Sequence, residues 1–451
     1  MKYQPYPEYK DSGIEWLDYL PIHWDKASLR WFCKIYAGGT PSKDRKEYWD
    51  KGTIPWLNSG AVNQPLIKKP SAYITEDAYR NSSAKWIPKG ALVIALAGQG
   101  KTKGTVAQLD IDATCNQSMS AIVPFRKFYI RFLYWWLNSN YQNIRNLAGG
   151  DLRDGLNLEL IGSIECPIPS IEEQVQIATF LDRETQKIDR LIEKQQQLIK
   201  LLQEKRQAVI SHVVTKGLNP NVKMKDSGVE WLGKIPEHWE VRKIKYIVEL
   251  ILTGTTPTTS KEKYFGGEIN WFTPGDLDNE LLVNSTKTVT DEAIKDNVVH
   301  LFPKDSVLVV GIGATTGKTS YLTVESAFNQ QITGFHSVAE NNRFLFYLFK
   351  SLSVVFINVA NYTTLPILNN EFFKNFVLVI PGKEEQEEIV EFLDRQVKQI
   401  DVLINKCNQA IELMKERRTA LISAAVTGKI DVRNMAVDNT DVTNVQGAAT
   451  A

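Results

Sequence analysis

The sequence contains one long internal repeat. KDSGIEWL at Lys10–Leu17 returns as KDSGVEWL at Lys225–Leu232, an offset of 215 residues (225 − 10). FLDRETQKID at Phe180–Asp189 returns as FLDRQVKQID at Phe392–Asp401, an offset of 212 residues (392 − 180). Solenoid units recur about every 20 to 50 residues, so this is instead a duplicated domain followed by a helix. The joints are nearly identical and the centres diverge, which predicts two different domains held in one frame.

Composition limits the class of protein. A length of 451 residues allows roughly two or three domains, and 43% hydrophobic residues is enough for two cores. No apolar run reaches the roughly 18 residues of a membrane span, and the N-terminus lacks the apolar segment of a signal peptide. Cys33, Cys115, Cys166 and Cys407 share no close spacing, so neither a metal cluster nor a disulfide framework is indicated. We expect a reduced, cytoplasmic protein without a metal.

The net charge of +1 neither supports nor excludes a nucleic-acid partner. Residues 1–169 hold 21 Lys and Arg against 16 Asp and Glu, whereas residues 220–380 hold 15 against 17. A nearly neutral protein still binds DNA when its basic side chains gather on one face. The sequence alone does not show such a face.

Two long helices are predicted. The first runs from Ser170 to about Val214, and Ser170 with Glu173 has the spacing of a capping box. Both segments carry apolar residues at a period of 3.5, as coiled coils do. We predict that the seam consists of Ile177, Leu181, Ile188, Leu191, Leu198, Leu202 and Val209 in the first helix, and of Ile389, Leu393, Ile400, Leu403, Met414 and Leu421 in the second.

The helices either pair with each other or each cap their own domain. The seam is longer than the surface of an ordinary domain, and its polar positions match in the two copies, which favours pairing. Parallel and antiparallel pairs are both open. The turn-like connector KGLNPN at 216–221 reverses the chain and favours the antiparallel pair.

Both globular regions are predicted to mix helices and strands. The apolar runs ALVIALA at 91–97 and VLVVGI at 307–312 have the length of strands, and IRFLYWWL at 130–137 and NRFLFYLF at 342–349 are typical of helices. An Asn–Gln pair stands at the same place in both copies, at 116–117 and 329–330. The predicted fold class is α+β with an internal pseudo-two-fold repeat.

A loop rich in Gly, Thr and Lys follows each central strand, GQGKTKG at 98–104 and GATTGKT at 313–319. A P-loop needs a further Gly five residues before its Gly-Lys, but Ala95 and Ile312 stand there, which argues against a nucleotide site. Such loops equally suit the phosphates of a polynucleotide, or they are exposed turns without a ligand. The DNA-facing candidates are Gln99, Lys101, Lys103, Thr315, Thr316 and Lys318.

The motifs YKDSGxEWL…IPxHW, IPxxEEQ…FLDRxxxxID and the VTKG or VTG helix end each occur in both halves, over about residues 1–432. They resemble the DNA specificity subunit of Type I restriction–modification systems. This resemblance implies two target-recognition domains that each read one half of a split, asymmetric DNA site. It also implies that the two paired helices recruit two methyltransferase subunits, and that two restriction subunits then join. A subunit of this kind has no catalytic site and no cofactor.

The resulting domain prediction follows the repeat. It places a first target-recognition domain at 1–169, a first long helix at 170–215, a connector at 216–224, a second target-recognition domain at 225–380 and a second long helix at 381–427. Residues 433–451 are predicted to form a disordered tail. The alternative is a coiled-coil scaffold for other proteins that does not bind DNA.

Overall fold

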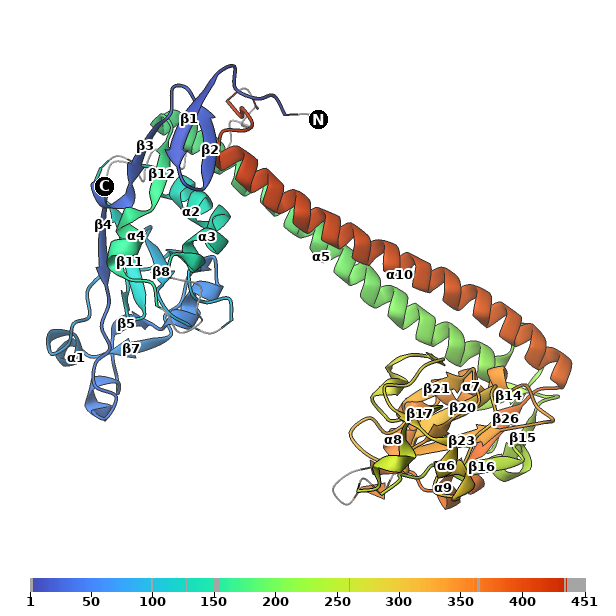
Figure 1. Ribbon diagram of the computed structural model, residues 1–451. Coiled ribbons are helices and arrows are strands. Elements are labelled where there is room, and N and C mark those ends of the chain that lie inside the picture. The colour runs from blue at the N-terminus through green and yellow to red at the C-terminus, as the bar shows by residue number, and fades with distance from the viewer. Residues whose placement is uncertain are drawn as a thin grey trace. The chain divides into compact units, whose positions relative to one another are not determined.

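The computed structural model describes residues 3–98, 100–126, 128–148, 155–258, 260–359, 361–362, 366–433 and 435. The chain divides into two compact units, Met1–Lys194 with Gln409–Ala451, and Gln195–Asn408. Helices α5 (Ile171–Lys216) and α10 (Lys383–Val426) each contribute to both units (Figure 1). Most of the predicted tail at 433–451 lies outside the described residues.

The first unit contains a domain built around one sheet. Within the described residues, five strands take the order β4-β11-β8-β9-β6, and a smaller sheet takes the order β10-β5-β7. The strands of these two sheets are β4 (Cys33–Ala37), β5 (Ile54–Leu57), β6 (Leu66–Ile67), β7 (Ala72–Ile74), β8 (Leu92–Ala95), β9 (Val106–Leu109), β10 (Thr114–Cys115) and β11 (Met119–Pro124). The helices are α1 (Glu76–Arg80), α2 (Ile130–Ser139), α3 (Tyr141–Asn146) and α4 (Leu158–Ser163).

The second unit repeats this topology in its own domain. Among the residues described there, the larger sheet has the order β16-β23-β20-β21-β18 and the smaller one β19-β17-β22. These strands are β16 (Leu250–Thr253), β17 (Phe265–Phe272), β18 (Leu281–Leu282), β19 (Thr288–Val289), β20 (Ser306–Val310), β21 (Thr319–Leu322), β22 (Ala327–Phe328) and β23 (Ile332–His336). The helices are α6 (Asp291–Lys295), α7 (Asn342–Ser351), α8 (Ser353–Val359) and α9 (Asn370–Asn375), and a short pair β24 (Asn361–Tyr362) and β25 (Pro366–Ile367) follows α8.

Each domain begins and ends on neighbouring strands. In the first unit β3 (Asp25–Ser28) pairs antiparallel with β12 (Glu165–Ile168), and in the second β15 (Glu240–Lys243) pairs with β26 (Val377–Ile380). A hairpin precedes each pair, formed by β1 (Tyr9–Ile14) and β2 (Leu17–Pro21), or by β13 (Met224–Asp226) and β14 (Lys234–Pro236). The chain therefore enters and leaves each domain at one place.

The long helices begin as their sequence predicts. The hydroxyl of Ser170 accepts a hydrogen bond from the Glu173 N–H at 3.2 Å, which is one half of the predicted capping box. The Glu173 carboxylate makes other contacts, so the second half of the box is absent among the described residues. Gly217 and Gly428 follow the two helix ends with φ values of +76° and +70°, a conformation that favours glycine.

The two helices pair antiparallel, as predicted. In the first unit Asp189 of α5 contacts Arg418 of α10, and Glu173 near the start of α5 lies close to Arg433 after the end of α10. In the second unit Arg206 contacts Asp401, whereas the end of α5 at Gly217 approaches Glu385 at the start of α10. In both units the two helices therefore run in opposite directions.

The helix seam lies partly one residue away from the predicted one. The positions turned inward along the pair are Ile188, Ile192, Gln195, Ile199, Leu202 and Arg206 on α5, and Ile400, Ile404, Cys407, Ile411, Met414 and Arg418 on α10. Leu191, Leu198 and Leu403 are instead 50%, 43% and 47% exposed, so the prediction that they form the seam is wrong. The predicted residues Ile177, Leu181, Ile389 and Leu393 are fully buried, but they belong to clusters that include their own domain.

Candidate DNA interface

Three segments meet at one edge of the larger sheet in the first domain. Because β11 pairs antiparallel with both β4 and β8, the loops that follow β4 and β8 lie beside the turn that precedes β11. The Gly39 N–H donates to the Cys115 carbonyl at 2.8 Å, and the Leu96 N–H donates to the Ser118 carbonyl at 2.8 Å. These two loops and this turn are called the loop edge below.

The second domain builds the same loop edge. The loops after β16 and β20 lie beside the turn that precedes β23. The Thr255 N–H donates to the Phe328 carbonyl at 3.0 Å, and the Gly311 N–H donates to the Gln331 carbonyl at 2.7 Å. The loop after β16 passes so close that a Cβ at Gly254 would lie 2.1 Å from the Phe328 carbonyl oxygen, and Gly38 is equally confined by Cys115. Glycine is required at this position in both domains.

A matching side-chain contact lies on each loop edge. The Thr40 hydroxyl donates to Oε1 of Gln117, and the Thr256 hydroxyl donates to Oε1 of Gln330. Behind them an indole N–H donates to the loop backbone, from Trp56 to Gly39 at 3.0 Å and from Trp271 to Thr255 at 3.1 Å. Both Trp side chains, which lie in β5 and β17, are buried, so they support the loop and do not stack on a base.

Each loop edge is hollowed, but beside different residues. In the first domain a cavity of about 420 Å³ is lined by Thr40, Lys43, Trp49, Trp56, Asn58, Asn116 and Gln117. In the second, a cavity of about 420 Å³ also touches Gln330, but its other walls include Gln331, Ile312 and Asn370. The shared parts therefore carry different surroundings.

The Gly–Lys loops belong to the same edges, but they do not present all of the predicted contacts. Lys101 is exposed, and its carbonyl accepts hydrogen bonds from Thr105 and Tyr141. Lys103 is only 3% exposed, so a large ligand cannot reach its ammonium group. Gln99 lies outside the described residues.

In the second domain Thr315 is exposed, whereas Thr316 is buried and its hydroxyl donates to the Gly313 carbonyl at 2.7 Å. Thr316 therefore closes a turn. Lys318 is half-buried and forms an ion pair with Asp278. Of the five candidates that the structure describes, Lys101, Thr315 and Lys318 have side chains that a polyanion can reach.

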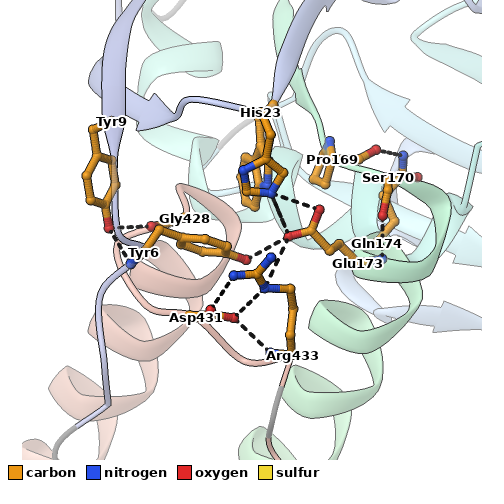
Figure 2. Close-up of polar contacts among 11 residues, drawn as sticks. Tyr6, Tyr9, His23, Pro169, Ser170, Glu173, Gln174, Gly428, Asp431 and Arg433 are labelled. Atoms are coloured by element: carbon orange, nitrogen blue, oxygen red, sulfur yellow. Dashed lines mark hydrogen bonds and ion pairs between the residues drawn. The ribbon is translucent and has the colours of Figure 1, made fainter.

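The start of each long helix is fastened to its domain by a repeated joint, and Figure 2 shows the copy in the first unit. In the first unit the Glu173 carboxylate accepts hydrogen bonds from Tyr6 (3.1 Å) and Trp24 (3.4 Å) and lies 3.1 Å from Nε2 of His23. Burial alone would raise the pKa of Glu173, but the hydrogen bonds from His23, Trp24 and Tyr6 lower it overall. His23 and Trp24 thus serve packing and hydrogen bonding.

The second unit forms this joint with fewer groups. Glu385 lies 2.8 Å from Nε2 of His238 and accepts from the indole of Trp239 at 2.9 Å. Gly217 sits against Trp239, where a Cβ would come within 3.3 Å of the ring. In the first joint Gly428 takes this place, because its Cβ would meet Pro21 and Trp24.

A second repeated anchor ties each domain to its helix. Arg131 of α2 forms an ion pair with Asp182 of α5 at 2.8 Å, and the indole of Trp135 donates to the same carboxylate. Arg343 of α7 contacts Asp394 of α10 at 2.9 Å, and Tyr347 donates to it. These repeated aspartates are structural, as the sequence predicts.

One family of known proteins matches both halves of the chain. The chain matches the family of the Type I restriction modification DNA specificity domain over residues 21–201 and again over residues 236–413. The chain belongs to this family.

Its relatives in the family are named specificity subunits. The chain is 24% identical to the Type I restriction enzyme MjaIX specificity subunit of Methanocaldococcus jannaschii, over 96% of this chain and 99% of that protein. It is 30% identical to the EcoR124I/EcoR124II specificity subunit of Escherichia coli, but this match covers 39% of the chain and only 42% of the relative.

Solved structures agree on the fold. A chain from a study of complex assembly and conformational transition of the type I R-M system covers 91% of this specificity chain at 17% identity, with a TM-score of 0.73. The HsdS subunit from Thermoanaerobacter tengcongensis covers 91% at 16% identity, with a TM-score of 0.56. As a member of this family the chain is a specificity subunit, the non-catalytic component that determines the DNA target sequence.

Metal-binding groups, cysteines and membrane-spanning helices can each be checked in the described residues. Within the described parts of this specificity subunit, no group of three or more His, Cys, Asp or Glu side chains is placed to hold a metal ion. The four cysteines are free and buried. No described helix is long and apolar enough to cross a membrane.

Sequence reasoning missed the Thr–Gln contact of the two loop edges. Its signals were present, because GGTP at 38–41 corresponds to GTTP at 254–257 and the Asn–Gln pairs recur. What the sequence does not show is that residues 77 positions apart, Thr40 and Gln117, come together. The antiparallel pairing of β4 with β11 brings them there.

Proposed function

We propose that this chain reads a bipartite, asymmetric DNA site, one half with the domain at 1–169 and the other with the domain at 225–380. The observation that carries this proposal is the loop edge, which is built twice on the same backbone contacts but with different surrounding side chains. A protein that reads two unlike sequences needs such a common scaffold with variable neighbours. This recognition is proposed to take place in the cytoplasm, where the target DNA lies.

The long helices are proposed to recruit two methyltransferase subunits, which two restriction subunits then join. Each unit exposes leucines on both helices beside the seam, Leu191 and Leu413 in the first, and Leu201 and Leu403 in the second. Contiguous exposed apolar patches mark surfaces that another protein covers, and we propose that the leucines of each unit are part of such a patch. Two equivalent sets suit two copies of one partner.

Mapping methylated bases tests the proposal. DNA from cells that contain this chain and its methyltransferase subunits is sequenced with a method that detects modified adenine and cytosine. The proposal expects one motif with two constant segments separated by a spacer of undefined sequence. A chain that is only a coiled-coil scaffold gives no motif, and neither do cells without the chain.

Charge removal at the loop edge gives the second test. Lys101→Ala or Lys318→Ala is expected to weaken binding to all DNA sequences alike and to reduce the slope of log affinity against log salt by about one unit. The matched control is Lys194→Ala, which removes an exposed lysine from helix α5. If neither loop variant changes the slope measured by filter binding, the Gly–Lys loops do not contact phosphates.

A further inference from the structure

The loop edge carries one polar device that both domains share. Thr40 holds Oε1 of Gln117, and Thr256 holds Oε1 of Gln330. Each threonine hydroxyl donates to the oxygen of a glutamine side-chain amide. The Nε2 group of the same amide is therefore left to donate to another acceptor. Both Gln side chains are exposed, and within the described residues neither Nε2 group donates to the protein.

The neighbours of this device differ between the domains. In the first, Asn58 and Asn116 line the cavity with Gln117, and the buried Oδ1 of Asn116 has no hydrogen-bond partner in the described structure. A buried acceptor without a partner is rare in proteins and indicates a missing donor. That oxygen is itself covered by the protein, and the cavity offers the exposed amides of Asn58 and Gln117 to whatever enters it.

In the second domain the residues at the same positions make hydrogen bonds within the protein. Thr273 stands where the first domain has Asn58, and its hydroxyl donates to Asp276 at 2.8 Å. Asn329 corresponds to Asn116 and makes two hydrogen bonds with Gln331. Its Nδ2 donates to Oε1 of Gln331 at 3.1 Å, and its Oδ1 accepts from the Gln331 N–H at 3.1 Å. Here Gln330 is the group left to face a ligand.

We propose that Gln117 and Gln330 each read a base edge in their half of the DNA site, with Thr40 and Thr256 as the residues that position them. This inference rests on the DNA-reading function proposed above and names the residues that perform it. The ligand is an acceptor atom of a base, such as purine N7, guanine O6 or thymine O4.

The chemistry explains why the two half-sites differ although the central Gln is shared. In the first domain Asn58 and Asn116 line the cavity beside Gln117, so a base that enters it meets further amide side chains. In the second domain these groups are satisfied internally, so Gln330 reads with fewer neighbours. The Gly–Lys loop on the same edge supplies phosphate contacts that position the reader without specifying sequence.

The experiment selects DNA from a random library with the assembled complex of this chain and its methyltransferase subunits. Gln117→Ala is expected to relax one base position of one half-site, by roughly 5- to 150-fold in preference, while the other half-site is unchanged. Gln330→Ala relaxes one position of the opposite half-site. Thr40→Val leaves Gln117 in place but unrestrained, and gives a smaller loss at the same position.

The controls separate the ways in which the inference fails. Gln186→Ala removes an exposed amide from helix α5 and leaves both half-sites intact. Gln117→Glu keeps the shape of the side chain and removes its donors, so it replaces the Ala variant if that variant does not assemble. An unchanged motif in the Gln117 and Gln330 variants overturns the inference. So does equal weakening on all sequences with a smaller salt slope, which marks a phosphate contact. If the wild-type complex selects no motif, the proposed function itself fails.

Discussion

The two halves of this chain fasten their domains to the helix pair with different strength. In the second unit Arg206 of α5 contacts both Asp401 of α10 and Glu280 of the domain, and Glu280 also pairs with Lys350 of α7. In the first unit Arg418 forms an ion pair with Asp189 alone among the described residues, and its guanidinium lies 5.9 Å from the ring of Trp135.

The difference comes from the domains and not from the helices. Arg206 and Arg418 are equivalent, as are Asp401 and Asp189, but the domain residues are not. Pro65 and Asn138 stand where the second domain has Glu280 and Lys350. A duplicated frame thus keeps its own ion pairs, whereas the attached domain is free to add or omit contacts to it.

The largest expected difference between the halves follows from removing these arginines. Arg206→Ala leaves Asp401 without its ion pair and Glu280 with Lys350 alone, and the Arg206 side chain is only 11% exposed. We expect local stability to fall by about 2 to 3 kcal/mol, because a charge left without its partner away from water is costly. Arg418→Ala, at 32% exposure, is expected to cost about 1 kcal/mol or less. Hydrogen exchange of α7 and α2 peptides measures both, and equal losses would contradict the comparison.

The joints at the starts of the long helices differ in the opposite direction, because the first unit has the more buried carboxylate with more partners. Glu173 is 7% exposed and serves Tyr6, His23 and Trp24, whereas Glu385 is 27% exposed and serves His238 and Trp239. Glu173→Gln is expected to cost about 2 kcal/mol and Glu385→Gln about 1 kcal/mol, because hydrogen bonds to a charged group weaken when the charge is removed.

Acid tests the Glu173 contribution without a mutation. The pKa of this carboxyl is lowered in the folded protein, so its stabilisation is complete above its ordinary value of 4.5 and is lost as the pH falls through the folded value. Denaturant unfolding of wild type and Glu173→Gln should therefore converge at low pH. A constant difference between them would show that the charge of Glu173 is not the cause.

The smallest expected effect concerns Lys350. Burial, with a contribution from the nearby Arg206, lowers the pKa of this lysine to about 7, while Asp401 acts in the opposite direction. The unfolded chain then binds the proton more tightly, so the second unit should gain stability as the pH rises from about 7 towards 10.5. The ion pair with Glu280 favours the charged form, so we expect a gain of only about 1 kcal/mol.

Lys350→Met should remove this rise, since the variant has no proton to lose. Lys374→Met changes an exposed lysine of the same unit and should retain it. Hydrogen exchange of α7 between pH 7 and pH 9, corrected for intrinsic rates, follows the effect. A rise of the same size in Lys350→Met would assign it to another group.

The parts of the fold that the sequence predicted are those with a strong periodic signal. The two long helices, their antiparallel pairing and the strands at 91–97 and 307–312 were recovered. The seam was displaced at Leu191 and Leu198 because each is followed by an isoleucine, Ile192 and Ile199, so two adjacent apolar residues compete for each position. Only contact with the other helix selects between them, and the isoleucines are turned inward.

The candidate site was predicted less well, for a physical reason. The sequence located the Gly–Lys loops, but it does not show whether a lysine ends in solvent, as Lys101 does, or within the fold, as Lys103 does. The partner of Lys318 is Asp278, which lies 40 residues away. Such pairings depend on sheet order, and no local pattern encodes them.

The matched joints have one more consequence, which concerns direction. Glu173 and Glu385 each hold the histidine and the tryptophan of their own joint, and the ion pairs Asp189–Arg418 and Asp401–Arg206 are equivalent. A second protein that contacts only these shared groups meets the same chemistry in both halves. An asymmetric DNA sequence nevertheless has a left and a right. The polarity of the assembly proposed above must therefore be encoded in the parts that differ, chiefly the two divergent domains, and exchanging the domains would reverse the orientation of the complex on its DNA.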